Sequence, residues 1–135
     1  RILNASDEIV GRVEPLLITA AALSIEDVFR ITEEAGGICI PAHVDRSSHS
    51  IFSNLGAIPE ELPVKNIEIS KDCDSASFLE EHPGLADYGI LRSSDAHYLW
   101  DISERENYIE TEKPIADAAD VIRLLREPQY HFFSF

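Results

Sequence analysis

The chain contains no methionine, only two cysteines and few basic residues. Eleven lysines and arginines stand against 25 aspartates and glutamates, which gives a formal net charge of −14 at pH 7. Because such a chain repels nucleic-acid phosphates and anionic lipids, direct nucleic-acid binding is disfavoured. Cys39 and Cys73 are too few for a disulfide framework in a chain of 135 residues, so we expect a reducing, cytoplasmic setting.

Long hydrophobic runs are also absent: no apolar stretch approaches the length of a membrane span, and we expect no membrane partner. Since the sequence opens on Arg1 and has no methionine anywhere, we expect a piece of a longer or processed protein. Its 135 residues fit one domain, and a hydrophobic share of 44% is enough to form a core.

Short apolar segments alternate with helical ones along most of the chain. Residues 2–13 predict a β-hairpin around the turn formers at 4–7. Ser24 is a good helix N-cap, Asp27 completes a capping box, and the glycine pair 36–37 ends that helix. The later predictions are strands at 38–40, 64–69, 89–91 and a last one at 108–110, a short helix from Ser75 or Ser77 to Glu81, and a helix that begins at Pro114 and ends at Pro128.

The order helix, glycine, apolar strand and polar loop is typical of a βα unit in a parallel sheet, so the predicted fold class is α/β, with about four strands and three helices. Polar residues follow two of the predicted strands, in the loops at 41–46 and 92–97. In parallel folds such loops share one end of the sheet, where ligands bind. We therefore expect the polar side chains of these two loops to converge.

These two loops carry the residues with the clearest chemistry. Asp95 and His97 are two positions apart, so an extended backbone would point both side chains the same way. A carboxylate and an imidazole suit manganese, zinc or iron, and His43 could supply a second nitrogen. Arg46 is the nearby cation that could hold a substrate phosphate. The other interpretation is a hydrogen-bonded Asp-x-His turn beside a structural histidine.

Four neighbouring residues have possible supporting roles. Glu68 and Ser94 could orient the metal-binding side chains through hydrogen bonds. For Glu68, a position on the exposed surface of a strand is an equally good interpretation. Tyr98 and Trp100 directly follow the Asp-x-His pair. They could pack beneath the site or stack on a nucleoside or another aromatic substrate.

The runs Pro41-Ala42-His43-Val44-Asp45-Arg46 and Ser94-Asp95-Ala96-His97 resemble the later two metal-binding motifs of the PHP family, the polymerase and histidinol phosphatase domains. The similarity is greatest to a set of small bacterial PHP proteins. It continues through residues 54–56, 58–60, 68–71 and 94–102, and spans nearly the whole chain.

The resemblance implies the C-terminal part of a distorted (β/α)7 barrel whose loops hold up to three Mn, Zn or Fe ions. Relatives hydrolyse phosphoesters with a metal-bridging hydroxide, so the implied substrate is a phosphorylated small molecule or a nucleotide. Asp95, His97 and His43 would each bind a different ion, and Arg46 would contact the substrate phosphate.

The early metal motifs of the family, a His-x-His pair and a later glutamate, have no counterpart, because no histidine precedes His43. Residues 1–135 would then form a single partial domain that lacks the N-terminal metal motifs. We expect it to be inactive alone, to bind metal weakly or not at all, and to pair with the missing N-terminal half or with itself. A non-catalytic PHP-like scaffold and a protein that binds a single ion are the hypotheses that stay open beside the enzyme.

Overall fold

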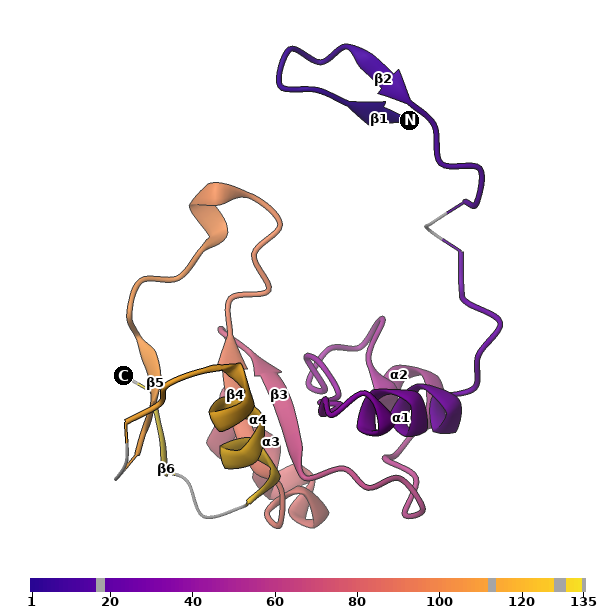
Figure 1. The fold of residues 1–135 in the computed structure, drawn as a ribbon. Helices are drawn as coiled ribbons and strands as arrows, with labels where there is room; N and C mark the ends of the chain where they lie inside the picture. The colour runs from indigo at the N-terminus through magenta and orange to yellow at the C-terminus, as the bar shows by residue number, and fades with distance from the viewer. Residues whose placement is uncertain (17–18, 112–113, 128–130, 135) are drawn as a thin grey trace.

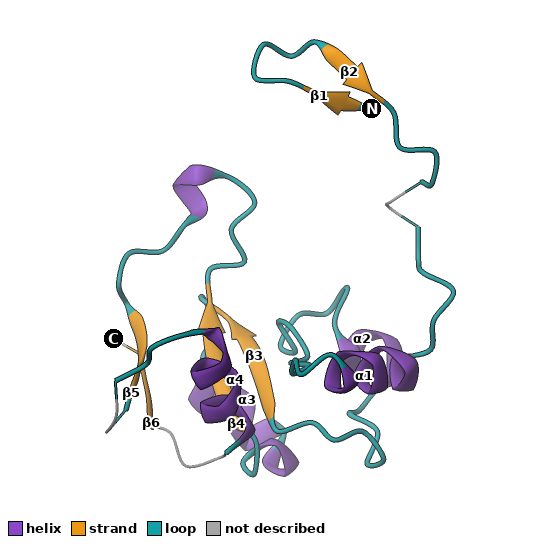
Figure 2. Cartoon of the chain, in the orientation of Figure 1, coloured by secondary structure: helices purple, strands orange, loops and turns teal. Residues whose placement is uncertain are grey.

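The computed structural model describes residues 1–16, 19–111, 114–127 and 131–134. These residues form a mixed α/β protein with three two-stranded sheets and four α-helices (Figures 1 and 2). No helix among them combines the length and the apolar composition that crossing a lipid bilayer requires.

The centre of the molecule is a parallel pair of strands, β3 (Asn66–Ser70) and β4 (Gly89–Ser93). They are connected by helix α3 (Ser75–Glu81) and a short 3₁₀ turn. Asn66 lies opposite Gly89, and Ser70 lies opposite Ser93, so both strands end at the same level. The predicted strands at 64–69 and 89–91, the helix between them and their parallel βα arrangement are confirmed, with boundaries shifted by about two residues.

The core is built on β3. Ile67 is 0% exposed, and Ile69 is almost as deeply buried. Asn66 is also fully buried, and its side-chain amide donates a 2.6 Å hydrogen bond to the carbonyl of Leu125 in helix α4. This bond ties the C-terminal helix to the central strand. The other buried apolar residues of the cluster are Phe29, Val44, Leu62, Val64 and Leu85.

The predicted N-terminal hairpin is confirmed: β1 (Ile2–Leu3) pairs antiparallel with β2 (Ile9–Gly11). The Asn4 side-chain oxygen accepts hydrogen bonds from the amides of Ser6 and Glu8, which closes the turn. The hairpin stands apart from the rest of the described chain, at the end of an irregular connector (Figure 1).

Helix α1 (Ile25–Glu34) begins as predicted. The Asp27 amide donates to the Ser24 hydroxyl, and the Asp27 carboxylate accepts from the Ser24 amide, so the capping box is complete. Gly36 has φ +80°, a left-handed conformation that ends the helix at little steric cost. Phe29 is the buried residue of this helix, and Ile25 also packs against the core.

Helix α2 (Ile51–Leu55) was not predicted. Its N-cap, Ser50, is buried, accepts from the Ser53 amide and donates its hydroxyl proton to the carbonyl of Arg46. Gly56 ends the helix with φ +79°. Five residues are too few for a helical hydrophobic period to stand out, although a serine cap and a following glycine are present in the sequence.

The strand predicted at 38–40 is wrong, since these residues form no regular strand. The segment that follows instead makes two backbone hydrogen bonds to Glu68 in β3: the Glu68 amide donates to the Pro41 carbonyl, and the Val44 amide donates to the Glu68 carbonyl. Pro41 has no amide to extend a ladder, and His43 turns the chain with φ +33°. The loop at 41–46 is therefore anchored beside β3 without being a strand.

Two predictions near the C-terminus are also wrong. Strand β5 (Asn107–Glu110) is not the last one, because it pairs antiparallel with β6 (His131–Ser134). Helix α4 (Ala118–Arg126) begins after Asp117 rather than at Pro114, because the Asp117 carboxylate caps it by accepting the Asp120 amide. The predicted stop at Pro128 lies outside the described residues.

Candidate functional site

The loops that follow β3 and β4 meet the loop at 41–46 at the carboxyl end of the parallel pair. Arg46 Nη1 lies 2.8 Å from Asp95 Oδ2, although the two residues are 49 positions apart. The predicted convergence of the two polar loops is therefore confirmed. The same contact shows that the predicted phosphate-binding cation and one predicted metal ligand form an ion pair with each other.

The Arg46–Asp95 ion pair is open to solvent. The side chain of Arg46 is 44% exposed and that of Asp95 is 26% exposed. Arg46 Nε also donates to the Ser70 hydroxyl, at 3.3 Å. A planar guanidinium at this position can recognise a phosphate or a carboxylate.

Asp45 and Ser70 belong to this site, although neither was predicted as a site residue. Asp45 Oδ1 accepts a 2.7 Å hydrogen bond from the Ser70 amide. This contact joins the end of β3 to the loop that carries Arg46. The sequence places Asp45 directly before Arg46 in one of the two predicted site loops. Only the fold shows that the Asp45 carboxylate accepts from the Ser70 amide.

Arg92 has a structural role at this end of the sheet. Its Nη1 donates to the carbonyls of Lys71 at 2.8 Å and Cys73 at 2.9 Å, which holds the loop after β3. Partial burial raises the pKa of the Cys73 thiol, and the nearby negative charge of Asp45 adds to this effect. Because the thiolate is the nucleophilic form, this shift disfavours a nucleophilic role for Cys73.

Two of the predicted ligands occupy unusual backbone positions. Four non-glycine residues in the described chain have positive φ, and His43 (+33°) and Asp95 (+49°) are two of them. Such conformations cost on the order of 1–3 kcal/mol and persist where the surrounding structure imposes them, often at functional sites. His43 is half-buried, and its Nδ1 atom is buried without a hydrogen-bond partner among the described residues.

His97 is exposed, and its Nδ1 lies 2.7 Å from the main-chain oxygen of Asp95. A carbonyl oxygen can only accept, so Nδ1 carries a proton in this contact, and Nε2 is the ring nitrogen left to bind another group. Metal-binding histidines commonly donate their second ring nitrogen to a carbonyl in this way. The hydrogen-bonded Asp-x-His turn considered above is thus present, and it is compatible with a ligand role for Nε2.

Of the two predicted supporting residues, Glu68 contacts the loop at 41–46 and Ser94 lies within the loop at 92–97. Glu68 is held by its backbone between Pro41 and Val44, but its carboxylate does not bond to His43 Nδ1. Ser94 is half-buried directly after the end of β4.

The types of ligand atom present fit manganese, zinc or iron, since Asp95 offers carboxylate oxygens and His97 offers an imidazole nitrogen. His43 Nδ1, which is buried and has no hydrogen-bond partner among the described residues, is a third atom of a type that binds these metals. Within the described ranges, however, no three or more His, Cys, Asp or Glu side chains are grouped closely enough to hold an ion. The types of ligand atom therefore suit such an ion, but the described residues bring fewer than three of these side chains together.

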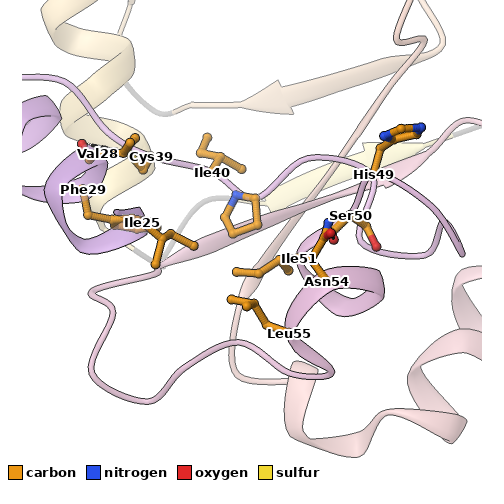
Figure 3. A pocket seen from close by; sticks show the side chains of 11 residues that line it. Ile25, Val28, Phe29, Cys39, Ile40, His49, Ser50, Ile51, Asn54 and Leu55 are labelled. Carbon is orange, nitrogen blue, oxygen red and sulfur yellow. Dashed lines mark hydrogen bonds between the residues drawn. The ribbon is translucent and has the colours of Figure 1, made fainter. Parts of the chain in front are cut away.

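A concave feature lies apart from this site, between α1 and α2 (Figure 3). It is an open groove of about 690 Å³, and its lining does not include Arg46, Asp95 or His97. Ile25 and Phe29 face it from α1, and Ile51 and Leu55 face it from α2, with His49 at one end. Its mainly apolar lining distinguishes it from the charged site at the strand ends.

Comparison with protein-family models, with curated proteins and with solved structures found no match to this chain.

Proposed function

We propose that this chain supplies one wall of a metal-dependent phosphoesterase site at the carboxyl ends of β3 and β4. The observation that carries the proposal is the contact between Arg46 and Asp95, which joins the two loops that resemble PHP metal motifs. It brings a cation suited to phosphate and a carboxylate suited to metal within 2.8 Å of each other.

In this proposal Asp95, His97 and His43 are metal ligands, and His97 binds through Nε2 because Nδ1 is engaged by the Asp95 carbonyl. Bound Mn, Zn or Fe would polarise a phosphoryl oxygen and lower the pKa of a coordinated water. Arg46 contacts the substrate phosphate with its planar guanidinium. The substrate is a phosphorylated small molecule or a nucleotide, since the net charge of −14 disfavours long nucleic acids.

The proposal treats residues 1–135 as a single partial domain, the C-terminal part of a distorted (β/α)7 barrel. Further ligands would come from an N-terminal half, and the chain alone would be inactive and bind metal weakly. Large exposed side chains support the need for a covering partner: Leu99 is 85% exposed and Trp100 is 80% exposed. The covering surface would be the N-terminal half or a second copy, in a cytoplasmic setting.

The test uses this chain and the longer polypeptide encoded with any upstream sequence. Both are purified metal-free, reloaded with manganese and assayed for phosphate release from phosphomonoesters and nucleotides. We expect turnover in the longer polypeptide only, and we expect Asp95→Ala and His97→Ala to abolish it. Arg30→Gln is the control, because Arg30 pairs with Asp27 and Glu34 on the surface of α1. Full activity in the Asp95 variant would contradict the proposal.

A non-catalytic PHP-like scaffold is the second candidate, and one observation favours it. Asp95 and Arg46 neutralise each other's charge in an ion pair. The enzyme would need the Asp95 carboxylate for the metal and the Arg46 guanidinium for the phosphate. Calorimetric titration of the longer polypeptide with manganese separates the two functions. Stoichiometric uptake that is lost in Asp95→Ala favours the enzyme, and no uptake in either protein favours the scaffold.

A further inference from the structure

We propose that the Arg46–Asp95 ion pair couples phosphate binding to metal binding, so that each ligand releases the residue that binds the other. Arg46 thus acts on the metal site through its contact with the Asp95 carboxylate. The inference rests on the proposed function, because it takes Asp95 as a metal ligand and Arg46 as the phosphate contact.

The Arg46 side chain can leave Asp95 without disturbing its own loop. The Arg46 amide donates to the His43 carbonyl at 3.0 Å, and the Arg46 carbonyl accepts from the buried Ser50 hydroxyl at 2.7 Å. The backbone is thus held on both sides by contacts that do not involve the guanidinium. Of the five N–H donors of the guanidinium, one meets Asp95 and one makes a longer bond to Ser70.

Asp95 is held in a similar way. Its carbonyl oxygen accepts from His97 Nδ1, while its carboxylate oxygen Oδ2 meets Arg46. The main-chain contact keeps Asp95 and His97 together whether or not the ion pair is made. A cation that binds Asp95 Oδ2 competes with the Arg46 guanidinium for that oxygen, and a phosphate that binds Arg46 Nη1 competes with Asp95 for that nitrogen.

These two competitions are linked. Phosphate bound to Arg46 removes a competitor of the metal, and metal bound to Asp95 removes a competitor of the phosphate. Linkage requires that both ligands strengthen each other by the same factor. Because the pair is partly exposed, we expect a factor of about two to five, in line with ion pairs of this kind.

The first experiment needs no metal. Inorganic phosphate is titrated into the metal-free chain and followed by phosphorus NMR. Asp95→Asn should bind phosphate about two- to fivefold more tightly than the unchanged chain, because Arg46 is released. Asp120→Asn is the matched control, since it removes one negative charge and breaks the Arg123–Asp120 ion pair in helix α4. Equal tightening in both variants, or none in Asp95→Asn, would overturn the coupling.

The second experiment measures Mn²⁺ binding by the loss of the free-ion electron paramagnetic resonance signal, with and without inorganic phosphate. We expect phosphate to tighten Mn²⁺ binding to the unchanged chain and to the Arg30→Gln control. Arg46→Gln should bind Mn²⁺ more tightly without phosphate and gain nothing when phosphate is added. Arg46→Lys, which keeps the charge, should recover part of the phosphate dependence.

The outcomes separate the coupling from the proposed function. If phosphate tightens Mn²⁺ binding equally in Arg46→Gln, phosphate acts by coordinating the metal directly and the coupling is wrong. If Mn²⁺ binds through Asp95 but phosphate has no effect on the unchanged chain, the coupling is wrong and the metal site stands. If neither the chain nor the longer polypeptide binds Mn²⁺, both proposals fail.

Discussion

The N-terminal hairpin and the central strand pair are both two-stranded, yet they differ in what surrounds them. The strands of the hairpin are exposed, apart from half-buried Gly11, and Figure 1 shows the hairpin apart from the body. Four of the five residues of β3 are buried. Strand pairing alone stabilises a two-stranded ribbon only marginally in water. The difference indicates that side-chain packing in the core, rather than strand pairing, stabilises β3.

The two regions also differ in how their pairing is encoded. The hairpin depends on a local turn, in which Asn4 gathers the amides of Ser6 and Glu8. The β3–β4 pair requires a crossover through α3 and contacts from distant segments. The candidate site lies on loops that extend from this second, buried region, so its geometry should survive changes in the hairpin.

The largest effect should come from the core. Replacing Ile67, which is fully buried, with alanine should lower the free energy of unfolding by about 2–5 kcal/mol, because it leaves a cavity beside β3. Val10→Ala in the hairpin should change it by less than about 0.5 kcal/mol, because Val10 is 62% exposed and packs on little. Urea denaturation followed by circular dichroism measures both. Similar losses in the two variants would show that the hairpin packs as firmly as the core.

Two asparagines sharpen the same comparison. Asn66→Ala should cost about 1–3 kcal/mol, because it leaves the Leu125 carbonyl without its buried donor. Asn4→Ala should leave the urea midpoint unchanged and only speed amide hydrogen exchange in the turn. If the midpoint of Asn4→Ala fell as far as that of Asn66→Ala, the two regions would unfold as one unit.

The cap of α1 should have a smaller effect. Ser24→Ala removes the acceptor of the Asp27 amide and should cost about 1 kcal/mol in urea denaturation. Ser6→Ala is the matched control, since Ser6 contributes its amide rather than its hydroxyl to the hairpin turn. A loss in Ser6→Ala as large as that in Ser24→Ala would contradict the assignment.

The smallest effect is a pH dependence of the same helix. Arg30, and then the Ser24 amide and hydroxyl, lower the pKa of Asp27 below its usual value. A lowered pKa in the folded state means that the carboxylate stabilises the helix fully above its ordinary pKa of 3.8, and that this contribution is lost as the pH falls from there through the lowered folded-state pKa. Helical circular dichroism between neutral and acid pH should show this loss, and Asp27→Asn should reduce it. An unchanged acid transition in that variant would contradict it.

Much of the local structure could be predicted from the sequence. The hairpin and the start of α1 were predicted from turn and capping residues, which act within a few positions. The errors arose where local signals were weak or were outweighed. Pro114 suggested a helix start, but α4 begins after its cap, Asp117. Residues 38–40 have the apolar composition of a strand, but they do not pair with a neighbouring strand.

The candidate site was predictable in part for a related reason. The βα order of the sequence indicated that the loops after two strands share one end of a sheet, and the contact between Arg46 and Asp95 confirms that expectation. The pairing of those two charges with each other was not predictable. Nor was the contact of Asp45 with the Ser70 amide, because the sequence does not say which backbone group will face an acid from another loop.

By itself, the sequence determined the residue types at the strand ends, the anionic charge, the hairpin and the N-terminal cap of α1. These properties depend on composition and on interactions within a few residues. Only the tertiary structure decided that Arg46 reaches Asp95 and that Asn66 binds the last helix. Such contacts depend on the direction of individual side chains after the core has packed around β3, and no local pattern specifies that direction.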